Sequence, residues 1–172
     1  MNDTRSIWTA ALVALLWPLS AQAAWYAGPQ LQVERSEHTA TLLATGEVLL
    51  CGGTGAMAQV LASCELVSPD RGTSRPAASM PVPVGVTSTG GRYRHTAVLL
   101  TTGEVLVVGG IALVNGAPAT VGWAALYTPA SDTWRTVASL ATDRASATAT
   151  RLTDGRVAII GGVRIVAPSG AL

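Results

Sequence analysis

Apolar and polar positions alternate in short stretches along this chain. Residues 38–43 alternate polar and apolar and then become continuously apolar, and a Thr-Gly-Glu turn follows at 45–47. Residues 48–51 form a short apolar run that is closed by Gly52 and Gly53. Alternation with a period of two is typical of a half-buried β-strand, and short apolar runs between turn residues are typical of buried strands. The pattern therefore predicts a hairpin.

The same hairpin pattern occurs twice more. It returns at residues 95–110 and at 147–162, each time with a glycine-containing turn and a closing Gly-Gly pair. The first glycines of the pairs are 57 (109 − 52) and 52 (161 − 109) residues apart. Self-similarity at about 40–50 residues is typical of stacked supersecondary units, with a β-propeller as the leading interpretation. Because one repeat cannot bury its own hydrophobic face, neighbouring repeats must cover it.

Two further strands are predicted in each of the first two repeats. Residues 61–67 and 123–127 are apolar segments that each end two residues before a proline, which has no N–H for a strand ladder. Residues 74–80 and 134–140 are the corresponding fourth strands. Four antiparallel strands per repeat predict an all-β fold of four-stranded blades.

Several short motifs recur in the same order within these repeats: an Arg/His opening, the double glycine, a Leu-Tyr-Thr-Pro segment and an Asp-Thr-Trp segment. In this order and spacing the chain resembles the kelch-repeat β-propeller family, as found in bacterial secreted propellers and in the central domain of galactose-oxidase-like proteins. The motif residues are Arg35, His38, Gly52, Gly53, Arg94, His95, Gly109, Gly110, Tyr127, Asp132, Trp134, Gly161 and Gly162.

The resemblance implies how residues 24–172 are divided. Propellers typically have four to eight blades, so we expect an incomplete arc that is truncated relative to a full propeller. Open blade edges and apolar end faces predict self-association. The expected parts are the fourth strand of a preceding blade at 25–31, blade one at 35–80, blade two at 94–140 and a half blade at 144–163.

The first 23 residues predict an export signal. Arg5 is followed by an apolar run at 7–17, a helix-breaking proline and Ala-Gln-Ala at 21–23. A membrane span needs about 20 apolar residues, which is more than this run supplies. We therefore expect cleavage after Ala23, a secreted or periplasmic product and no membrane span in the mature chain. The alternative is a buried N-terminal helix.

Composition and charge limit the partners. The formal net charge is +1, and every basic residue that carries it is an arginine. Nucleic-acid binding requires a basic patch, so we expect no nucleic-acid partner. Charged residues make up only 12% of the chain and apolar ones 49%, which predicts extensive burial between sheets.

The two cysteines, Cys51 and Cys64, lie on strands two and three of one repeat. If these strands pair across the loop between them, residues whose numbers sum to 115 face each other, and 51 and 64 do. A cross-strand disulfide is the favoured interpretation in an oxidising compartment. The alternative is a small core residue, because Cys51 takes the place of Val108 and Ile160. Two cysteines are too few for a metal site, and no metal is predicted.

No catalytic residue and no cofactor are predicted. His38 and His95 share one repeat position, and such residues usually serve packing or a recurring hydrogen bond. The Gly-x-Ser-x-Gly motif of serine hydrolases is absent. The copper oxidases of the resembling family need two tyrosines, two histidines and a cysteine, and nothing aligns the three tyrosines here with such a site. Glu47 and Glu104 lie in turns.

Binding has more support from the sequence. The loop between strands two and three and the loop to the next repeat open on the same face, and there the repeats differ most. These loops are 54–60, 81–93, 111–122 and 141–143. Candidate ligand-binding residues on this face are Met57, Gln59, Arg92, Tyr93, Asn115 and Asp143. The alternative is that the loops merely tolerate change.

We therefore expect a secreted, non-catalytic interaction module for an unknown protein or carbohydrate. One alternative is a fragment of a propeller enzyme, such as a galactose-oxidase-like copper oxidase or a kelch-type sugar epimerase. Another is a truncated product without activity of its own.

Overall fold

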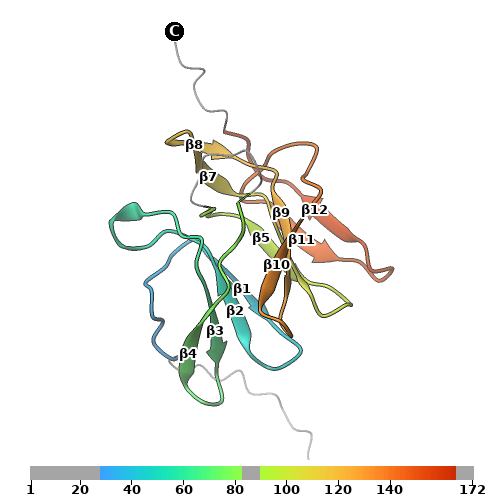
Figure 1. The fold of residues 1–172 in the computed structure, drawn as a ribbon. Helices are drawn as coiled ribbons and strands as arrows, with labels where there is room; N and C mark the ends of the chain where they lie inside the picture. Colours follow the sequence, from blue (N-terminus) through green and yellow to red (C-terminus); the bar gives the residue numbers. More distant parts are fainter. Residues whose placement is uncertain (1–27, 83–89, 166–172) are drawn as a thin grey trace, which may run out of the picture.

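The structure is a computed structural model that describes residues 28–82 and 90–165. The predicted export signal lies outside these residues. Within them the chain forms twelve β-strands and one short 3-10 segment at Ala56–Ala58, and all the strand pairs are antiparallel (Figure 1). No helix in these ranges is long and apolar enough to cross a membrane.

Two four-stranded sheets follow each other in the chain and have the same strand order. The first sheet has the order β1-β2-β3-β4, formed by Thr39–Leu42, Val48–Cys51, Cys64–Ser68 and Thr73–Ala77. The second sheet has the order β5-β6-β9-β10, formed by Thr96–Leu99, Val105–Val108, Ala124–Thr128 and Thr133–Val137. Strands β11 (Thr148–Arg151) and β12 (Val157–Ile160) form a C-terminal hairpin. The expected all-β fold with antiparallel four-stranded sheets is confirmed.

A hairpin lies where the sequence analysis expected an irregular loop at 111–122. Strands β7 (Ile111–Val114) and β8 (Ala117–Thr120) pair across Asn115 and Gly116. Both turn residues have positive φ, 52° and 80°, as a two-residue hairpin turn requires. The Asn-Gly pair between apolar residues is a strong hairpin signal that the repeat comparison overlooked.

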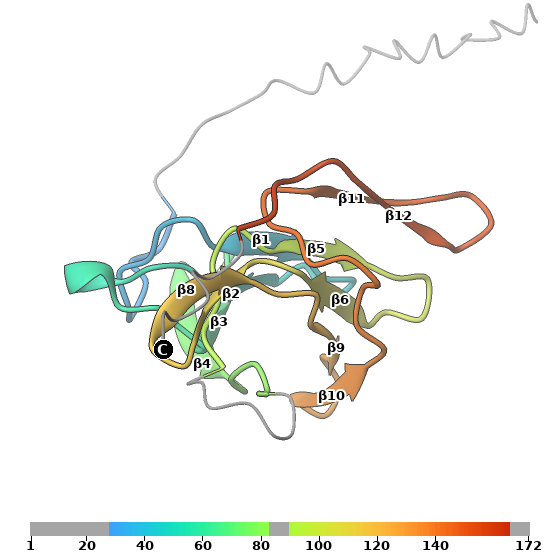
Figure 2. The same cartoon turned by 90° about the horizontal axis from the view of Figure 1, so that it is seen from above.

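The first strands of the three repeats lie side by side. Strand β5 contacts β1 on one side and β11 on the other (Figure 2). Backbone hydrogen bonds join consecutive repeats here, because the Gly53 N–H donates to the Arg92 carbonyl and the Gly110 N–H to the Arg144 carbonyl, both at 2.9 Å.

The first glycine of each pair permits this approach, because a Cβ atom on Gly52 or Gly109 would overlap the Arg92 or Arg144 carbonyl oxygen of the next repeat. The second glycine lies against the segment that opens its own repeat. Gly53 and Gly110 have φ values of 94° and 104°, which residues with a side chain rarely adopt. A Cβ atom on Gly53 would overlap the Ser36 carbonyl oxygen, and one on Gly110 would lie 2.8 Å from the Tyr93 carbonyl oxygen. The Gly-Gly repeat is therefore a packing requirement of the first strands.

The core lies between the facing sides of the first and second sheets. Leu49 and Leu66 of the first sheet pack in one cluster with Val105 and Val107 of the second, and all four are buried. The short apolar runs that hold these residues are the pattern that predicted the strands. Burial of such side chains stabilises the fold by roughly 1.5–3 kcal/mol each.

The fourth strand expected at 25–31 falls partly outside the described residues, so it stays a prediction. Residues 25–27 lie outside the described residues, and residues 28–31 adopt no strand. The chain that follows is instead held by Glu65, whose carboxylate accepts hydrogen bonds from the N–H groups of Gln32 and Val33. A carboxylate therefore anchors this segment to the first sheet.

Candidate functional site

A groove of about 500 Å³ lies where the β2–β3 loop, the segment before β5 and the β7–β8 hairpin meet. The sequence analysis placed ligand binding on the variable loops, and three of those loops contribute to the groove: 54–60, 81–93 through Tyr93, and 111–122. Its lining includes Glu37, Val60, Tyr93, Arg94, Ile111 and Leu113.

Glu37 and Arg94 hold the same repeat position, two residues before the start of their first strand, and Ser146 is the third member. All three have positive φ, at 55°, 52° and 55°. The Arg94 N–H donates to the Glu37 carbonyl at 3.1 Å, and the Ser146 N–H donates to the Arg94 carbonyl at 2.8 Å. Such backbone conformations cost on the order of 1–3 kcal/mol each in residues other than glycine and gather at ligand sites.

The side chains of Glu37 and Arg94 form an ion pair in the groove. Arg94 Nε donates to Glu37 Oε1 at 2.5 Å, and its guanidinium carbon lies 5.9 Å from the centre of the Tyr93 ring. The Arg94 side chain is 50% exposed and that of Glu37 32%. Among the described residues, no hydrogen bond engages Nη1 or Nη2 of Arg94. Glu37 thus holds the Arg94 guanidinium at Nε, and Nη1 and Nη2 stay accessible.

The rest of the groove is largely apolar. Ile111 is buried, and Val60 and Leu113 are half-buried. The backbone of Ile165 lies beside the end of β8. There the N–H and Oγ1 of Thr120 both donate to the Ile165 carbonyl. The groove therefore combines apolar walls with one charged pair.

Of the six predicted ligand-binding residues, Tyr93 lines this groove. Met57 and Gln59 are exposed in the adjoining β2–β3 loop, and Asn115 is exposed at the tip of the β7–β8 hairpin. Asp143 is half-buried beside Gly122. The structure does not bring these residues together.

Arg92 is not exposed on the loop face, because its guanidinium is enclosed. Only 1% of Arg92 is exposed, and its Nη1 donates to the Trp123 carbonyl at 2.8 Å. The equivalent bond in the first repeat runs from Arg35 to the Ser63 carbonyl. Arg92, and not Arg94, is therefore the counterpart of Arg35. Burial lowers the pKa of Arg92 to about 10.

Of the two matched histidines, His95 makes a hydrogen-bond contact between repeats. His95 is buried, and its Nε2 lies 2.9 Å from Oγ1 of Thr39 on β1. Burial and the nearby Arg92 charge lower the pKa of His95 to about 3. Burial and Arg35 also lower the pKa of His38.

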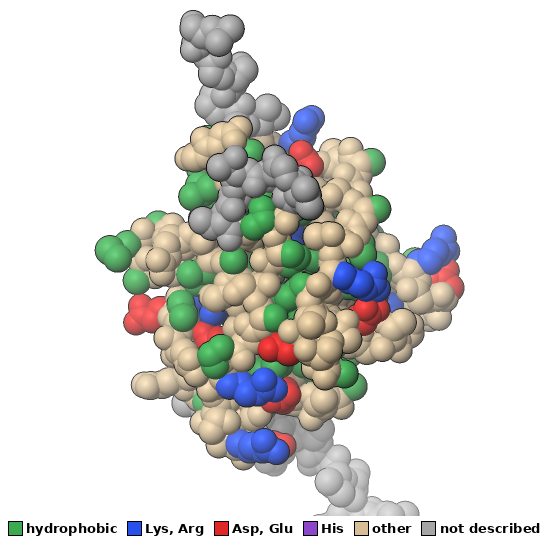
Figure 3. Space-filling view, viewed as in Figure 1, with side chains coloured by type: hydrophobic (Ala, Val, Ile, Leu, Met, Phe, Trp, Pro, Cys, Tyr) green, Lys and Arg blue, Asp and Glu red, His purple; other side chains and the backbone are tan. Residues whose placement is uncertain are grey.

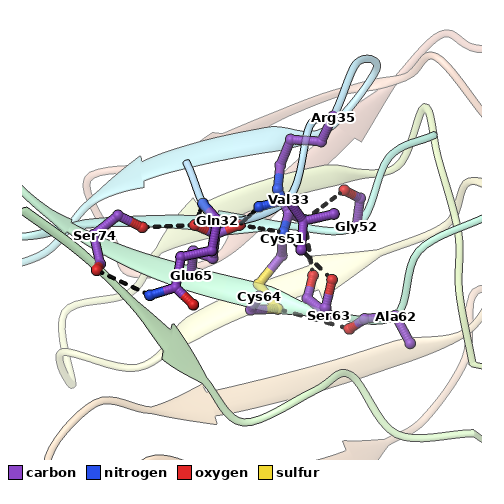
Figure 4. Close-up of polar contacts among 10 residues, drawn as sticks. All are labelled: Gln32, Val33, Arg35, Cys51, Gly52, Ala62, Ser63, Cys64, Glu65 and Ser74. Carbon is purple, nitrogen blue, oxygen red and sulfur yellow. Dashed lines mark hydrogen bonds and ion pairs between the residues drawn. A yellow bond between two sulfur atoms is a disulfide. The ribbon is translucent and has the colours of Figure 1, made fainter. Parts of the chain in front are cut away.

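A second polar cluster, which the sequence analysis missed, lies under the first sheet. Arg35 Nη2 donates to Glu65 Oε1 at 2.8 Å, with 0% and 3% of the two side chains exposed. Ser74 Oγ also donates to Glu65, at 2.6 Å (Figure 4). Burial raises the pKa of Glu65, but the hydrogen bonds from Ser74 and Arg35 outweigh it and lower that pKa overall. A single carboxylate inside the apolar run of β3 is the signal that could have revealed it.

The predicted cross-strand register of Cys51 and Cys64 is confirmed. The two residues face each other across β2 and β3, and their sulfur atoms are joined at 2.09 Å beside the Arg35–Glu65 pair (Figure 4).

Surface charges form local pairs. In Figure 3 basic side chains adjoin acidic ones, and no face of one charge sign is seen in this view. The turn residues Glu47 and Glu104 pair with Arg75 and Arg135 at 3.1 Å and 3.0 Å. Within residues 28–82 and 90–165, no cluster of three or more His, Cys, Asp or Glu side chains suits a metal ion.

Comparisons with known proteins inform the fold. No protein-family model and no curated protein matches the sequence. Among solved structures, the structure of YjhT is similar, with a TM-score of 0.64 and 18% identity. The match covers 80% of this chain but only 37% of the YjhT chain, so this chain spans well under half the length of that protein. At this identity the likeness concerns the fold alone.

Proposed function

We propose that this chain is an exported, non-catalytic binding module built from kelch-type propeller blades, with the groove beside Arg94 as its ligand site. One observation supports this most: the first strands of consecutive repeats are joined by the same backbone hydrogen bonds. Gly53 and Gly110 each donate to the arginine that opens the next repeat. Propellers arrange their blades around an axis in this way, with loops gathered on the faces.

The state of the polar groups favours binding over chemistry. A general base must reach the proton that it removes and be free to accept it. In the groove Glu37 is already paired with Arg94. His95 is buried against Thr39 with a strongly lowered pKa. These side chains are therefore placed to hold structure and to present charge.

Amide hydrogen exchange tests the arrangement of the repeats. The N–H groups of Gly53, Arg94, Gly110 and Ser146 donate between repeats and not within a sheet. We expect all four to exchange slowly in the folded chain, at rates close to those of the strand amides. Fast exchange at these four sites, with protected strands, would contradict the propeller arrangement.

A ligand screen tests the groove. The full chain, immobilised and probed with glycan and peptide panels, should retain ligands that a Leu113→Asp variant loses, because that carboxylate would enter an apolar wall. Leu152→Asp is the matched control, since Leu152 is 39% exposed at the β11–β12 hairpin, outside the groove. Equal loss in both variants, or retention in both, contradicts a ligand site in the groove.

The export part of the proposal has its own test. Expressed in a secretion-competent bacterium, the chain should lose residues 1–23 and begin at Ala24, because the apolar run is short and Ala-Gln-Ala precedes the cleavage point. Intact-mass measurement of the exported protein reports the new N-terminus. Retention of Met1 would overturn export by cleavage.

A further inference from the structure

We infer that the groove binds an extended polypeptide segment in which an aliphatic or aromatic side chain stands next to a carboxylate. This inference rests on the proposed binding function and names the ligand class for the same groove. It follows from the apolar walls and from the state of the Arg94 guanidinium, two independent features of the site.

The walls favour an apolar side chain. Val60 of the β2–β3 loop and Leu113 of β7 are half-buried, Ile111 at the start of β7 is buried, and all three line the groove. A ligand side chain seated here removes the remaining apolar surface from water. A sugar would instead turn hydroxyl groups toward the side chains of Val60, Ile111 and Leu113, which offer no hydrogen-bond partner, and that is unfavourable. A polypeptide side chain therefore fits better than a carbohydrate.

Arg94 supplies the charge that selects a carboxylate. Its Nε is engaged by Glu37, whereas Nη1 and Nη2 have no hydrogen bond to any described residue. These two nitrogens present parallel N–H groups at the end of the guanidinium, which match the two oxygens of a carboxylate. The charged pair thus leaves one bidentate position free for a ligand.

The guanidinium is also held in place before a ligand arrives. Glu37 fixes it on one side, and the Tyr93 ring lies 5.9 Å away. The Arg94 backbone is bonded through its N–H to Glu37 and through its carbonyl to Ser146. A charge that is already positioned loses less conformational entropy on binding than a free surface arginine does.

The size of the groove indicates a short segment. Its volume of about 500 Å³ lies within the range of pockets that enclose small ligands. The recognised unit is therefore an anchor side chain and its acidic neighbour, presented by an extended chain in the manner of other peptide-binding grooves.

The test begins with a random heptapeptide phage library selected on the immobilised full chain. Selected peptides should be enriched in an apolar residue next to Asp or Glu. One such peptide is then measured by calorimetry against the wild-type chain and Arg94→Gln. We expect at least a tenfold weaker dissociation constant for Arg94→Gln. Changing the peptide's Glu to Gln should cost the same factor, and combining both changes should cost little more, as a double-mutant cycle requires.

Arg135→Gln is the matched control. Arg135 is 57% exposed and paired with Glu104 at the opposite end of the second sheet, so it resembles Arg94 in exposure and pairing. This variant should bind the peptide like the wild type. Arg94→Lys is a second variant that keeps the charge but loses the bidentate geometry, and it should bind with intermediate affinity. Melting curves of all variants report whether each is folded.

Each outcome decides between the two proposals. Peptides that bind Arg94→Gln and the wild type equally overturn the carboxylate assignment, while the Leu113→Asp arm still tests the groove. Enrichment of apolar peptides that lack Asp and Glu would also overturn the carboxylate assignment. A glycan that binds in the groove when no peptide is selected overturns the polypeptide class and leaves the binding function standing. Selection of no ligand of either kind overturns both.

Discussion

The first and second sheets share strand order and register, yet different chemistry holds each to its surroundings. In the first sheet the disulfide joins β2 to β3, where the second sheet has Val108 opposite Ala124. Glu65, which anchors the segment before β1, corresponds to Ala125. The two repeats thus share strand pairing, whereas the side-chain contacts that hold each sheet to neighbouring segments differ.

The second sheet uses aromatic side chains where the first has small ones. Tyr127 and Trp134 face each other on β9 and β10 with ring centres 5.1 Å apart, at the positions of Val67 and Ser74. Trp134 Nε1 donates to the carbonyl of Ala78, just after β4. The second sheet is therefore joined to the first by a side-chain hydrogen bond. The first sheet is joined to the chain segment before it through the Glu65 carboxylate, which binds the N–H groups of that segment and the Arg35 guanidinium.

The two buried arginines provide the largest expected contrast. Arg35→Met leaves the Glu65 carboxylate buried without its cation, which typically costs about 3–5 kcal/mol. Arg92 has no acidic partner among the described residues, so Arg92→Met removes an unpaired buried charge and should cost much less. Urea unfolding of both variants measures the difference. The double variant Arg35→Met, Glu65→Leu should recover most of the loss, and equal losses in the two single variants would contradict the comparison.

The disulfide provides the next contrast. Giving the first sheet the residues of the second, Cys51→Val with Cys64→Ala, should lower the free energy of unfolding by about 3 kcal/mol, because the unfolded chain loses a closed loop. A reducing agent should lower the melting temperature of the wild type and leave that of the double variant unchanged. No response of the wild type to reduction would show that the bond does not contribute.

Acid should weaken the junction between the repeats. The pKa of His95 is lowered to about 3 in the folded chain, whereas in the unfolded chain it has its ordinary value of about 6.5. Below pH 6.5 the unfolded chain therefore binds a proton that the folded chain does not, and stability falls as the pH falls through this window. At pH 5 the loss from His95 is about 2 kcal/mol.

The matched variant is His95→Gln, which retains a hydrogen-bonding group toward Thr39. Urea unfolding at pH 7.5 and pH 5 should show a smaller difference for His95→Gln than for the wild type. The same pH dependence in both would mean that other groups cause the acid sensitivity.

The smallest expected effect concerns the aromatic contact. Trp134→Phe removes the hydrogen bond to the Ala78 carbonyl but keeps an aromatic ring, and should cost about 1 kcal/mol. Trp123→Phe is the control, because within the described residues the Trp123 indole N–H donates no hydrogen bond. A larger loss for Trp123→Phe than for Trp134→Phe would indicate that packing, and not the hydrogen bond, dominates at these tryptophans.

Local patterns predicted much of the strand content for a physical reason. The alternation at 38–43, the turn at 45–47 and the closing glycines depend on neighbours in the chain, so β1 and β2 were predictable within about one residue. The pairing of Cys51 with Cys64 followed from strand register alone. The β7–β8 hairpin was missed although Asn115-Gly116 signals it, because the repeat comparison assigned that stretch to variation between repeats.

The candidate site was less predictable. Tyr93 was identified because it lies in a variable loop. Arg92 was misplaced because two arginines lie near His95, and only the hydrogen bond to Trp123 shows which one corresponds to Arg35. Glu37 could not be paired with Arg94 from sequence, since the two are 57 residues apart and meet only when consecutive repeats stand side by side.

The sequence by itself therefore determined the strands, their order within each repeat and the register that aligns the cysteines, because these depend on side-chain periodicity and turn residues. Tertiary structure alone decided which arginine is buried, where Glu65 binds and how the groove forms. Those outcomes depend on the packing of one repeat against the next. There, the same residue type has different surroundings: Arg92 is an enclosed structural cation, and Arg94, two residues later, is a half-exposed cation paired with Glu37.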